Sequence, residues 1–516
     1  MNHIEQKFKL KATFEKIYNS TWTIWIILAI GIYIRVVQYI ANRSLWLDEA
    51  MLSLNIVHRT LFGLLKPLIY NQAAPIGFLF LEKLAVLIFG PNEYSLRLFP
   101  LLSGVIALFL FYKVSRLYIK DKAVPFSVFL FSISYILIRY SSEVKPYSSD
   151  VLVALILYLI ASPFFSKENG NRKYIIFGIV GALCIWISYP SVFVLAGVGT
   201  TIFISYLYSG KWKQIVKLSV IYLFWIINFA IFYTFSLHNL QSHNRLVHAL
   251  KESFAPSPVE SLPKFKWYFY HFYFGTFQYF FRSEVYMVAA FLFIIGFAKI
   301  LIEKNVKLTA IFSPIVFLLI ASLLGKYPIG GRLILFLISP IILITSEGVV
   351  ELISKYSGKK VVLIIGILLT FISYPLNDTL KALVVPIKKE EIKPAMKYIS
   401  KNAKKDDTIY VYFGAIPAFK FYSERFNIDK KNCILASWGS KHDLNVFLDE
   451  VKKLRGKKRV WFLISHVRPK RKIDEEKFLL FNLDRMGHRI DSRKYIGASV
   501  YLYDLTGSKM ATLNDP

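Results

Sequence analysis

The stretch WTIWIILAIGIYIRVVQYI, residues 22–40, is an apolar run of membrane-spanning length, and WLDEA, residues 46–50, follows shortly after it. A run of this length with so few charged residues predicts a transmembrane helix. Asp48 and Glu49 then form an adjacent pair of carboxylates at a membrane boundary, where ionisable side chains are functional candidates. A purely local alternative is that Asp48 caps a helix that starts at Glu49.

The composition extends this interpretation to the whole chain. The chain has 516 residues, of which 55% are hydrophobic and 16% aromatic, and its mean hydropathy is +0.46. Repeated apolar runs of spanning length predict a polytopic α-helical membrane protein. The 64 Lys and Arg against 33 Asp and Glu give a net charge of +31, but the bases cluster in short segments between the apolar runs. That distribution is typical of topology signals and contacts with membrane lipids, and it argues against a nucleic-acid partner.

The cysteines and the N-terminal segment do not change the predicted class of protein. Cys184 lies in an apolar run and Cys433 near the C-terminus, so the two predict neither a disulfide framework nor a metal site. The segment before Trp22 is polar and Lys-rich, and no small-residue cleavage site follows the run. We therefore expect an uncleaved first span rather than a signal peptide.

Loop charge determines the predicted topology. The segment 75–90 is short and carries Glu82 and Lys83 near its middle, which predicts an interfacial or re-entrant helix rather than a span. With a cytoplasmic N-terminus, the short basic loops then fall inside, as the positive-inside rule requires, and the C-terminus is external. The prediction is a multi-pass protein of a bacterial or archaeal plasma (inner) membrane with about eleven spans. They are placed at 22–40, 94–118, 122–140, 147–165, 173–189, 191–209, 214–235, 284–302, 307–324, 331–347 and 360–376.

The composition changes near residue 377, where long apolar runs stop. We therefore predict a transmembrane domain, residues 1–376, with a first external loop at 42–93, and an external soluble domain, residues 377–516. Short β-rich strings alternate there with charged helical ones, which predicts a small α/β module. The strands are expected at 408–412, 433–436, 459–464 and 498–503, and helices at 444–454 and 475–486.

Two further segments carry unusual chemistry to the predicted external face. The connection 139–150 contains Arg139, Glu143, Lys145 and Asp150 close to membrane depth, where charged groups are expected to have partners; its alternative is an ordinary polar loop. The turn 325–332 carries Lys326, two adjacent glycines and Arg332. Glycines allow close backbone approach and the bases suit phosphate, which favours an anionic ligand. The alternative is a plain turn with snorkelling bases.

The long loop 236–283 also falls on the predicted external face. It contains His238, His243, His248 and His271, but their spacing matches no standard metal site, so the prediction is of no metal centre. The aromatic run 267–274 is expected to be an interfacial belt or an amphipathic helix. A more specific alternative is that this aromatic surface guides the tail of a lipid substrate.

Together these motifs make the chain resemble polyprenyl-phosphate-sugar-dependent glycosyltransferases of the GT-C membrane fold, near the protein mannosyltransferases and the lipid A aminoarabinose transferases. The resemblance covers nearly the whole chain. It rests on the order and spacing of four pieces, each of them weak alone. They are the first-loop acid in 45–49, the helix 75–90 followed by NEYSLRL at 92–98, the Glu143-x-Lys145-x-Tyr147 connection, and KYPIGGR at 326–332.

The resemblance implies a sugar donor on a polyprenyl phosphate, an acceptor entering from the external side, and inversion at the anomeric carbon. Asp48 would be the general base for the acceptor hydroxyl, and Glu49 would orient or support it. The residues implied in substrate binding divide by charge. Lys326 and Arg332 would meet the lipid phosphate with Arg97 or Arg139 in reserve, while Glu143 and Tyr147 would hold sugar or acceptor hydroxyls or pair with those bases.

One departure from the family pattern concerns the segment NQAAP, residues 71–75. Relatives often carry Glu-Lys-Pro or His-x-Pro there, so a phosphate contact or metal ligand from that position does not carry over. No cofactor is predicted as required, and a divalent cation stays an open alternative. Two other classes also stay open: a flippase for a lipid-linked sugar, and a non-catalytic scaffold. The acceptor is a glycan, a lipid or a protein, and the sequence does not name the sugar.

Overall fold

The computed structural model describes residues 20–166, 170–237, 251–281, 286–437, 444–467 and 474–507. The chain divides into two compact units, one of residues 1–41 and 60–386, the other of residues 42–59 and 387–516. The segment that carries Asp48 thus belongs to the same compact unit as the C-terminal domain. The boundary that we expected at residue 377 falls inside a helix that continues to Val384, and the second unit resumes at Ile387.

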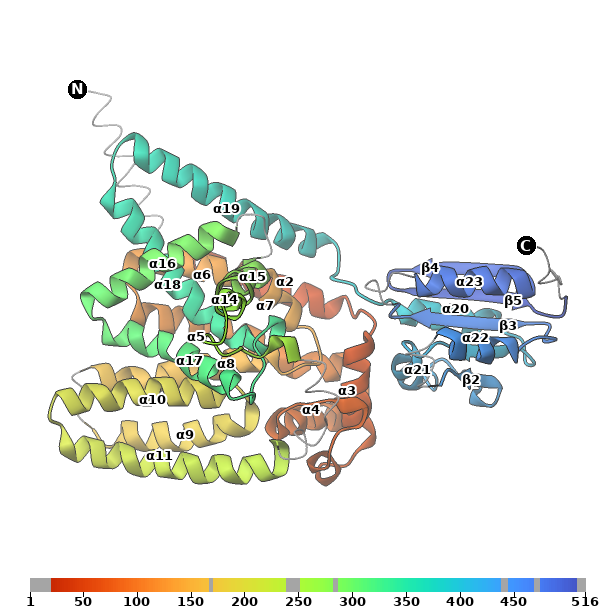
Figure 1. The fold of residues 1–516 in the computed structure, drawn as a ribbon, viewed down its shortest axis with the longest axis horizontal. Coiled ribbons are helices and arrows are strands. Elements are labelled where there is room, and N and C mark those ends of the chain that lie inside the picture. Colours follow the sequence, from red (N-terminus) through yellow and green to blue (C-terminus); the bar gives the residue numbers. More distant parts are fainter. Residues whose placement is uncertain are drawn as a thin grey trace. The chain divides into compact units, whose positions relative to one another are not determined.

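The first unit is a bundle of long apolar helices (Figure 1). Within the described ranges, nine helical segments are long and apolar enough to cross a membrane. The predicted spans include these nine and two others: 122–140 is broken into two short helices around Ser134, and the helix within 173–189 has 16 residues. The α-helices of this unit are α2 Thr21–Ile40, α4 Ile76–Phe89, α5 Glu93–Tyr118, α6 Val124–Ser132, α7 Tyr135–Tyr140, α8 Tyr147–Ala161, α9 Arg172–Ile187, α10 Ser191–Tyr208, α11 Trp212–Phe232, α14 Leu262–Trp267, α15 Gly275–Phe281, α16 Tyr286–Glu303, α17 Val306–Leu323, α18 Ile338–Lys355 and α19 Lys359–Val384.

Glycines let two of these helices approach closely. Helices α16 and α18 pack against each other, and Gly296 on the first lies beside Gly348 on the second. A Cβ atom on Gly348 would lie 1.9 Å from the carbonyl oxygen of Leu292, and one on Gly296 would lie 2.0 Å from that of Ile344. Small residues at such crossings permit backbone contact between membrane helices. This pair therefore fixes the distance between α16 and α18.

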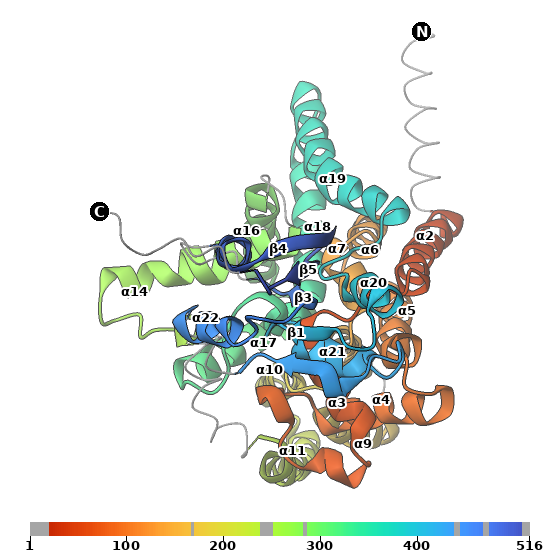
Figure 2. The same cartoon turned by 90° about the vertical axis from the view of Figure 1, so that its right-hand side faces the viewer.

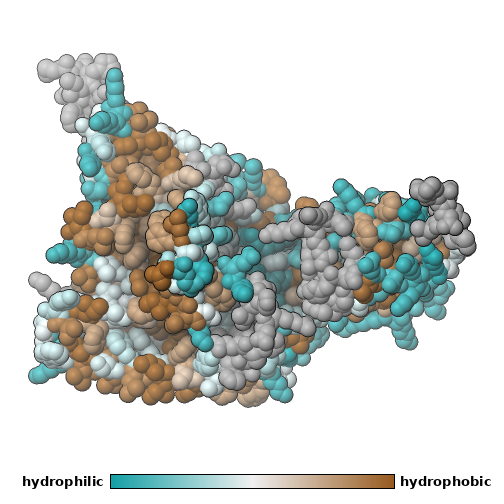
Figure 3. Space-filling model, viewed as in Figure 1, coloured by the Kyte–Doolittle hydropathy of each residue, from teal (hydrophilic) through white to brown (hydrophobic). Residues whose placement is uncertain are grey.

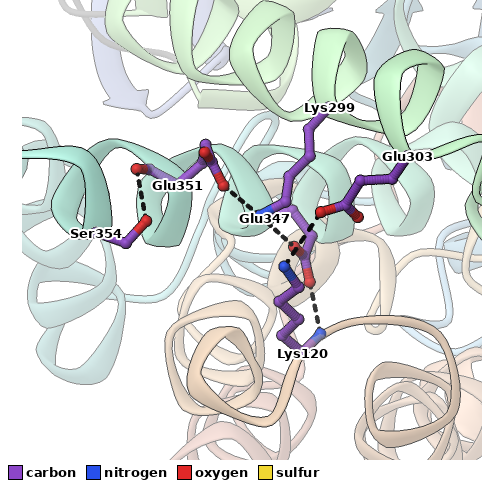
Figure 4. A network of polar contacts seen from close by, with 6 residues as sticks. All are labelled: Lys120, Lys299, Glu303, Glu347, Glu351 and Ser354. Atoms are coloured by element: carbon purple, nitrogen blue, oxygen red, sulfur yellow. Dashed lines mark hydrogen bonds and ion pairs between the residues drawn. The ribbon is translucent and has the colours of Figure 1, made fainter.

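Charged side chains form a network of ion pairs around the buried Glu347 and Lys299 (Figure 4). Glu347, which is 1% exposed, accepts a hydrogen bond from the backbone N–H of Lys120 at 2.5 Å and lies 3.8 Å from the ammonium of Lys299. Lys299 also pairs with Glu351, and the Lys120 ammonium pairs with Glu303 at 3.4 Å. Charge at membrane depth needs such partners. The network links the loop before α6 to α16 and α18.

The outer surface of the helical unit is apolar over wide areas (Figure 3). Large hydrophobic side chains are exposed along α11, including Val216, Val220 and Leu223, and along α19, including Val362 and Leu363. An exposed apolar surface of this kind is stable in contact with lipid rather than water. The composition and the surface thus agree on a membrane protein.

The second unit is a five-stranded sheet with helices on both faces, and its strands are drawn in shades of blue in Figure 2. The strand order is β2-β1-β3-β5-β4, with β1 parallel to β2 and β3, and β5 antiparallel to β3 and β4. Helix α20 packs against β3, β4 and β5, while α22 and α23 share a buried cluster with the tyrosine-rich face of the sheet. The elements are α3 Leu47–His58, α20 Ile392–Asn402, β1 Thr408–Val411, α21 Ile416–Tyr422, β2 Cys433–Leu435, α22 Leu444–Lys452, β3 Val460–Ser465, α23 Glu475–Met486, β4 His488–Tyr495 and β5 Ala498–Asp504.

The predicted α/β character of this domain is confirmed. The four expected strands are β1, β2, β3 and β5, and the two expected helices are α22 and α23, each within a few residues of its expected bounds. The fifth strand, β4, and the helices α20 and α21 were not predicted. The sheet is mixed, because β5 returns antiparallel to β3.

Candidate active site

The polar turn between α7 and α8 carries three of the predicted site residues. Arg139 lies in the last turn of α7, and its Nε atom donates to Oε1 of Glu143 at 2.8 Å. Glu143 is 1% exposed, and Tyr147, the first residue of α8, is 7% exposed. A buried carboxylate beside a guanidinium is stable only while both are present, since removing one leaves an uncompensated charge. The predicted pairing of Glu143 with a nearby base is therefore present.

Tyrosine side chains connect this turn to a distant part of the chain. The hydroxyl groups of Tyr140 and Tyr279 are 2.9 Å apart, and the rings of Tyr140 and Tyr147 meet edge to face with centroids 5.1 Å apart. The guanidinium of Arg332 lies 5.4 Å from the centroid of the Tyr147 ring. Tyr279 is within electrostatic range of both Arg139 and Arg332. Four predicted residues, Arg139, Glu143, Tyr147 and Arg332, thus form one cluster.

A cavity of about 640 Å³ lies beside this cluster. Arg139 and Tyr279 line it, together with the backbone of Gly330 and Gly331. Gly331 begins the 3₁₀ helix Gly331–Leu337 with a left-handed φ of +49°, a conformation that other residues rarely adopt. The glycine pair of the predicted anion-binding turn therefore does border a space large enough for a ligand headgroup.

The aromatic run 267–274 also reaches this cavity. The run continues α14 as a π-helix, Tyr268–Phe274, and then joins α15. Trp267 and His271 line the cavity with their aromatic rings stacked, 6.0 Å apart between centroids. The aromatic run is thus helical, its predicted place at the membrane interface stays a prediction, and one side of the run forms a wall of the cavity.

Two other predicted cations, like Arg332 itself, are outside the lining of the cavity. The Lys326 side chain is exposed and does not line the cavity, although it comes from the same turn as Arg332. Arg97 on α5 is 1% exposed and lies within electrostatic range of Tyr39, and it too is outside the lining of the cavity. Arg139 and Arg332 are the two cations of this set that both lie within electrostatic range of Tyr279.

Lys145 finds its partner in the segment where the chain departs from the family pattern. Its ammonium donates to Oε1 of Gln72 at 2.7 Å, and both side chains are buried. A neutral amide thus accepts from Lys145 at a place where relatives often carry a charged residue. The contact shows a structural use for Gln72 that needs no metal.

Asp48 and Glu49 lie in the first turn of α3, in the second unit. The helix begins at Leu47, not at Glu49, and its N-cap residue is Trp46, whose side chain makes no capping hydrogen bond. The hypothesis that Asp48 caps this helix is therefore wrong. Glu49 is fully buried, and Asp48 is half-buried.

Several residues that shape these sites were not singled out by the sequence. Tyr140 and Tyr279 belong to the cluster, and Glu390 and His466 contact each other near the start of α3. In the part of the chain that the structure describes, no three His, Cys, Asp or Glu side chains are arranged to hold a metal ion. Three histidines of the long loop, His238, His243 and His248, lie outside the described residues.

The comparisons with known proteins point to one fold. Residues 73–238 match the family model described as dolichyl-phosphate-mannose-protein mannosyltransferase, and no curated protein is similar in sequence. ArnT from Cupriavidus metallidurans, solved with bound undecaprenyl phosphate, matches 96% of this chain and 100% of its own, at 12% identity and a TM-score of 0.54. The chain has the fold of ArnT.

A second solved structure extends the ArnT comparison. The archaeal oligosaccharyltransferase AglB from Archaeoglobus fulgidus, in complex with an inhibitory peptide and a dolichol-phosphate, matches 96% of this chain and 75% of its own, at 12% identity and a TM-score of 0.51. The predicted GT-C-type fold and the resemblance to lipid-phosphate-dependent glycosyltransferases are thus confirmed. The region matched by the family model contains Arg139, Glu143 and Tyr147, whereas Asp48 and Arg332 lie outside it.

Proposed function

We propose that this chain is a membrane glycosyltransferase that moves a sugar from a polyprenyl-phosphate donor to an acceptor hydroxyl on the external face. The observation that carries the proposal is the paired Arg139–Glu143 cluster beside a cavity, within the region that matches a lipid-phosphate mannosyltransferase family. The ArnT-like fold along nearly the whole chain supports the same class. Relatives of this fold bind undecaprenyl phosphate or a dolichol-phosphate.

In the proposed reaction, the acceptor oxygen forms a bond to the anomeric carbon as the bond from that carbon to the phosphate oxygen breaks, with inversion. Asp48 accepts the proton of the acceptor hydroxyl, a role that a positioned carboxylate performs with a rate gain of roughly 10²–10⁴. The departing phosphate carries the electron pair. Arg332 and Arg139 stabilise the growing negative charge, because fixed cations act most strongly where charge develops.

The remaining residues are assigned supporting roles. Glu143 holds Arg139 in place and, with Tyr147, faces the hydroxyls of the sugar or the acceptor. Glu49, buried next to the base, supports the first turn of α3. Lys326 is exposed, so we place it at the membrane surface as a secondary contact for phosphate, and Arg97 as a structural cation within the bundle.

The test has two stages. Mass spectrometry of the lipids that co-purify with the full-length protein identifies the donor, and release of polyprenyl phosphate from that lipid is then followed in membranes that supply the acceptor. We expect Asp48→Asn to lower release by roughly 10²–10⁴-fold. Asp121→Asn is the matched control, because Asp121 is exposed, pairs with Arg116 and belongs to the loop before α6; it is expected to keep normal activity.

The same experiment separates the enzyme from its alternatives. A flippase moves the lipid-linked sugar intact, so no free polyprenyl phosphate appears in any variant. A scaffold neither releases phosphate nor depends on Asp48. Normal release by Asp48→Asn, with the variant folded as judged by size-exclusion chromatography, contradicts the assignment of the base.

A further inference from the structure

The segment that carries Asp48 is bound along its length by residues 389–393 of the C-terminal domain. The backbone N–H of Ser44 donates to Oε1 of Glu391 at 3.3 Å, and the N–H of Lys393 donates to Oγ of Ser44 at 3.0 Å. The Lys389 ammonium lies 3.4 Å from the centroid of the Trp46 ring. These contacts join two parts of the chain that are more than three hundred residues apart.

Glu390 contacts Leu47, the residue before Asp48. Its Oε2 atom accepts from the N–H of Leu47, the first residue of α3, at 2.8 Å, and its Oε1 atom lies 2.6 Å from Nδ1 of His466. The first N–H groups of a helix have no partner within the helix, and a carboxylate there also matches the helix dipole. Since Trp46 provides no side-chain cap, Glu390 serves as the cap of α3 from the C-terminal domain.

The backbone next to Glu390 is held by the turn between β4 and β5. The N–H of Glu391 donates to the carbonyl of Ile496 at 2.7 Å, in the turn between β4 and β5. Gly497 in this turn has a left-handed φ of +66°, and a Cβ atom there would lie 2.1 Å from the carbonyl oxygen of Lys389. Leu45 is held on the other side, where its N–H donates to the buried Tyr422 hydroxyl at 2.9 Å. The turn between β4 and β5 therefore supports the segment 389–391 that caps α3.

We propose that Glu390 is a positioning residue of the active site and that the C-terminal domain acts as the support of the catalytic carboxylate. The inference rests on the proposed role of Asp48 as general base. Asp48 is the second residue of α3, so the cap on Leu47 fixes the turn from which its carboxylate projects. General-base catalysis depends on such placement, and a misplacement of about 1 Å can reduce a rate roughly 10²-fold.

The first test separates kcat from KM in the full-length protein. We expect Glu390→Ala to lower kcat by roughly 10–100-fold while KM for the lipid donor changes less than about twofold. Glu390→Gln keeps an acceptor oxygen for the Leu47 N–H and is expected to recover part of that loss. The double variant Asp48→Asn with Glu390→Ala is expected to be no slower than Asp48→Asn alone, because Glu390 acts through Asp48. Asp449→Ala, an exposed partner of Lys452 in the same domain, is the control.

The second test does not depend on activity. Hydrogen exchange of the full-length protein is expected to become faster in residues 42–50 of Glu390→Ala, with β3 and β5 unchanged. If the wild-type protein transfers no sugar, the proposed function is contradicted. The exchange measurement still tests whether Glu390 caps α3. The inference is overturned if Glu390→Ala leaves kcat or the exchange of residues 42–50 unchanged. It is also overturned if the losses in the double variant add, or if exchange becomes equally faster in β3.

Discussion

Lys326 and Arg332 come from one glycine-rich turn, yet they lie in different surroundings. Lys326 is exposed, whereas Arg332 is half-buried and its guanidinium lies over the ring of Tyr147. Water and salt screen the charge of an exposed ammonium, and a partly buried guanidinium keeps more of its attraction for a phosphate. The two bases look equivalent in the sequence, but Arg332 is expected to contribute more than Lys326 to the affinity for the donor phosphate.

We expect Arg332→Ala to weaken binding of undecaprenyl phosphate to the purified protein by roughly 10–100-fold, the value of a charge-assisted contact of about 1.5–3 kcal/mol. Lys326→Ala serves as the matched variant from the same turn and is expected to weaken binding by less than about threefold. Arg332→Lys is expected to fall between them, because an ammonium cannot bind phosphate in a bidentate manner. Equal losses in the two alanine variants contradict this difference. Titration with the labelled lipid in detergent measures all three.

The sequence singled out these candidate residues only where a charged side chain stood out against an apolar background. Arg139, Glu143 and Arg332 are conspicuous as charges next to spans. Tyr279 is one of 32 tyrosines, and Glu390 lies in a strongly charged stretch, so neither is distinctive alone. Their contacts are with residues far away in the sequence. Glu390, for example, binds the backbone N–H of Leu47, which is 343 residues away. A single sequence contains no information on such pairings.

At the scale of elements, the apolar runs predicted most helices of the bundle. They did not predict the boundaries and breaks that depend on contacts with distant residues. Helix α3 starts at Leu47, before the expected Glu49, and the Leu47 N–H is bound by Glu390 from a distant part of the sequence. The run 122–140 breaks around Ser134, whose backbone is extended, although its composition resembles that of an unbroken span. Strand β4 pairs only with β5 at the edge of the sheet, and its residues 488–495 are mainly polar and exposed. An edge strand of this kind lacks the apolar signal from which strands are predicted.

The contact between α16 and α18 yields a prediction on stability. We expect Gly348→Ala to destabilise the protein by about 1–3 kcal/mol or more, because the added methyl group collides with the backbone of Leu292 and the two helices must separate. Thermal unfolding of the detergent-solubilised protein measures the change. Gly366→Ala on α19 is the control, since no atom lies within 4 Å of its Cβ position. There, alanine is expected to be neutral or to stabilise the helix by up to about 1 kcal/mol. An unfolding temperature unaffected by Gly348→Ala contradicts close packing at this crossing.

For the whole molecule, the charges of the loops predict the orientation of the chain in the membrane. The basic loop 355–360 is assigned to the cytoplasm and the C-terminal domain to the external side. Lys359 is the first residue of the long apolar helix α19 and Lys458 lies beyond its end, and both side chains are exposed. These two lysines are therefore expected to lie on opposite sides of the membrane.

We expect a membrane-impermeant maleimide to label Lys458→Cys in intact cells and to label Lys359→Cys only after the membrane is opened. Both variants are made in a chain whose Cys184 and Cys433 are replaced. Burial raises the pKa of the native Cys433 to about 11, so this thiol reacts too slowly to serve as the reporter. Labelling of Lys359→Cys in intact cells, with Lys458→Cys protected, reverses the predicted orientation.

The composition of the second unit from residues 42–59 and 387–516 has a consequence for biosynthesis. A ribosome that adds about 5–20 residues per second produces Glu390 roughly 20–70 s after Leu47. During that interval every helix of the bundle can enter the membrane, while the turn that holds Asp48 still lacks its cap. Under the proposed role of Asp48, a chain truncated before Glu390 is therefore expected to enter the membrane without the cap on α3, and only a chain translated through its sheet is expected to form the proposed site.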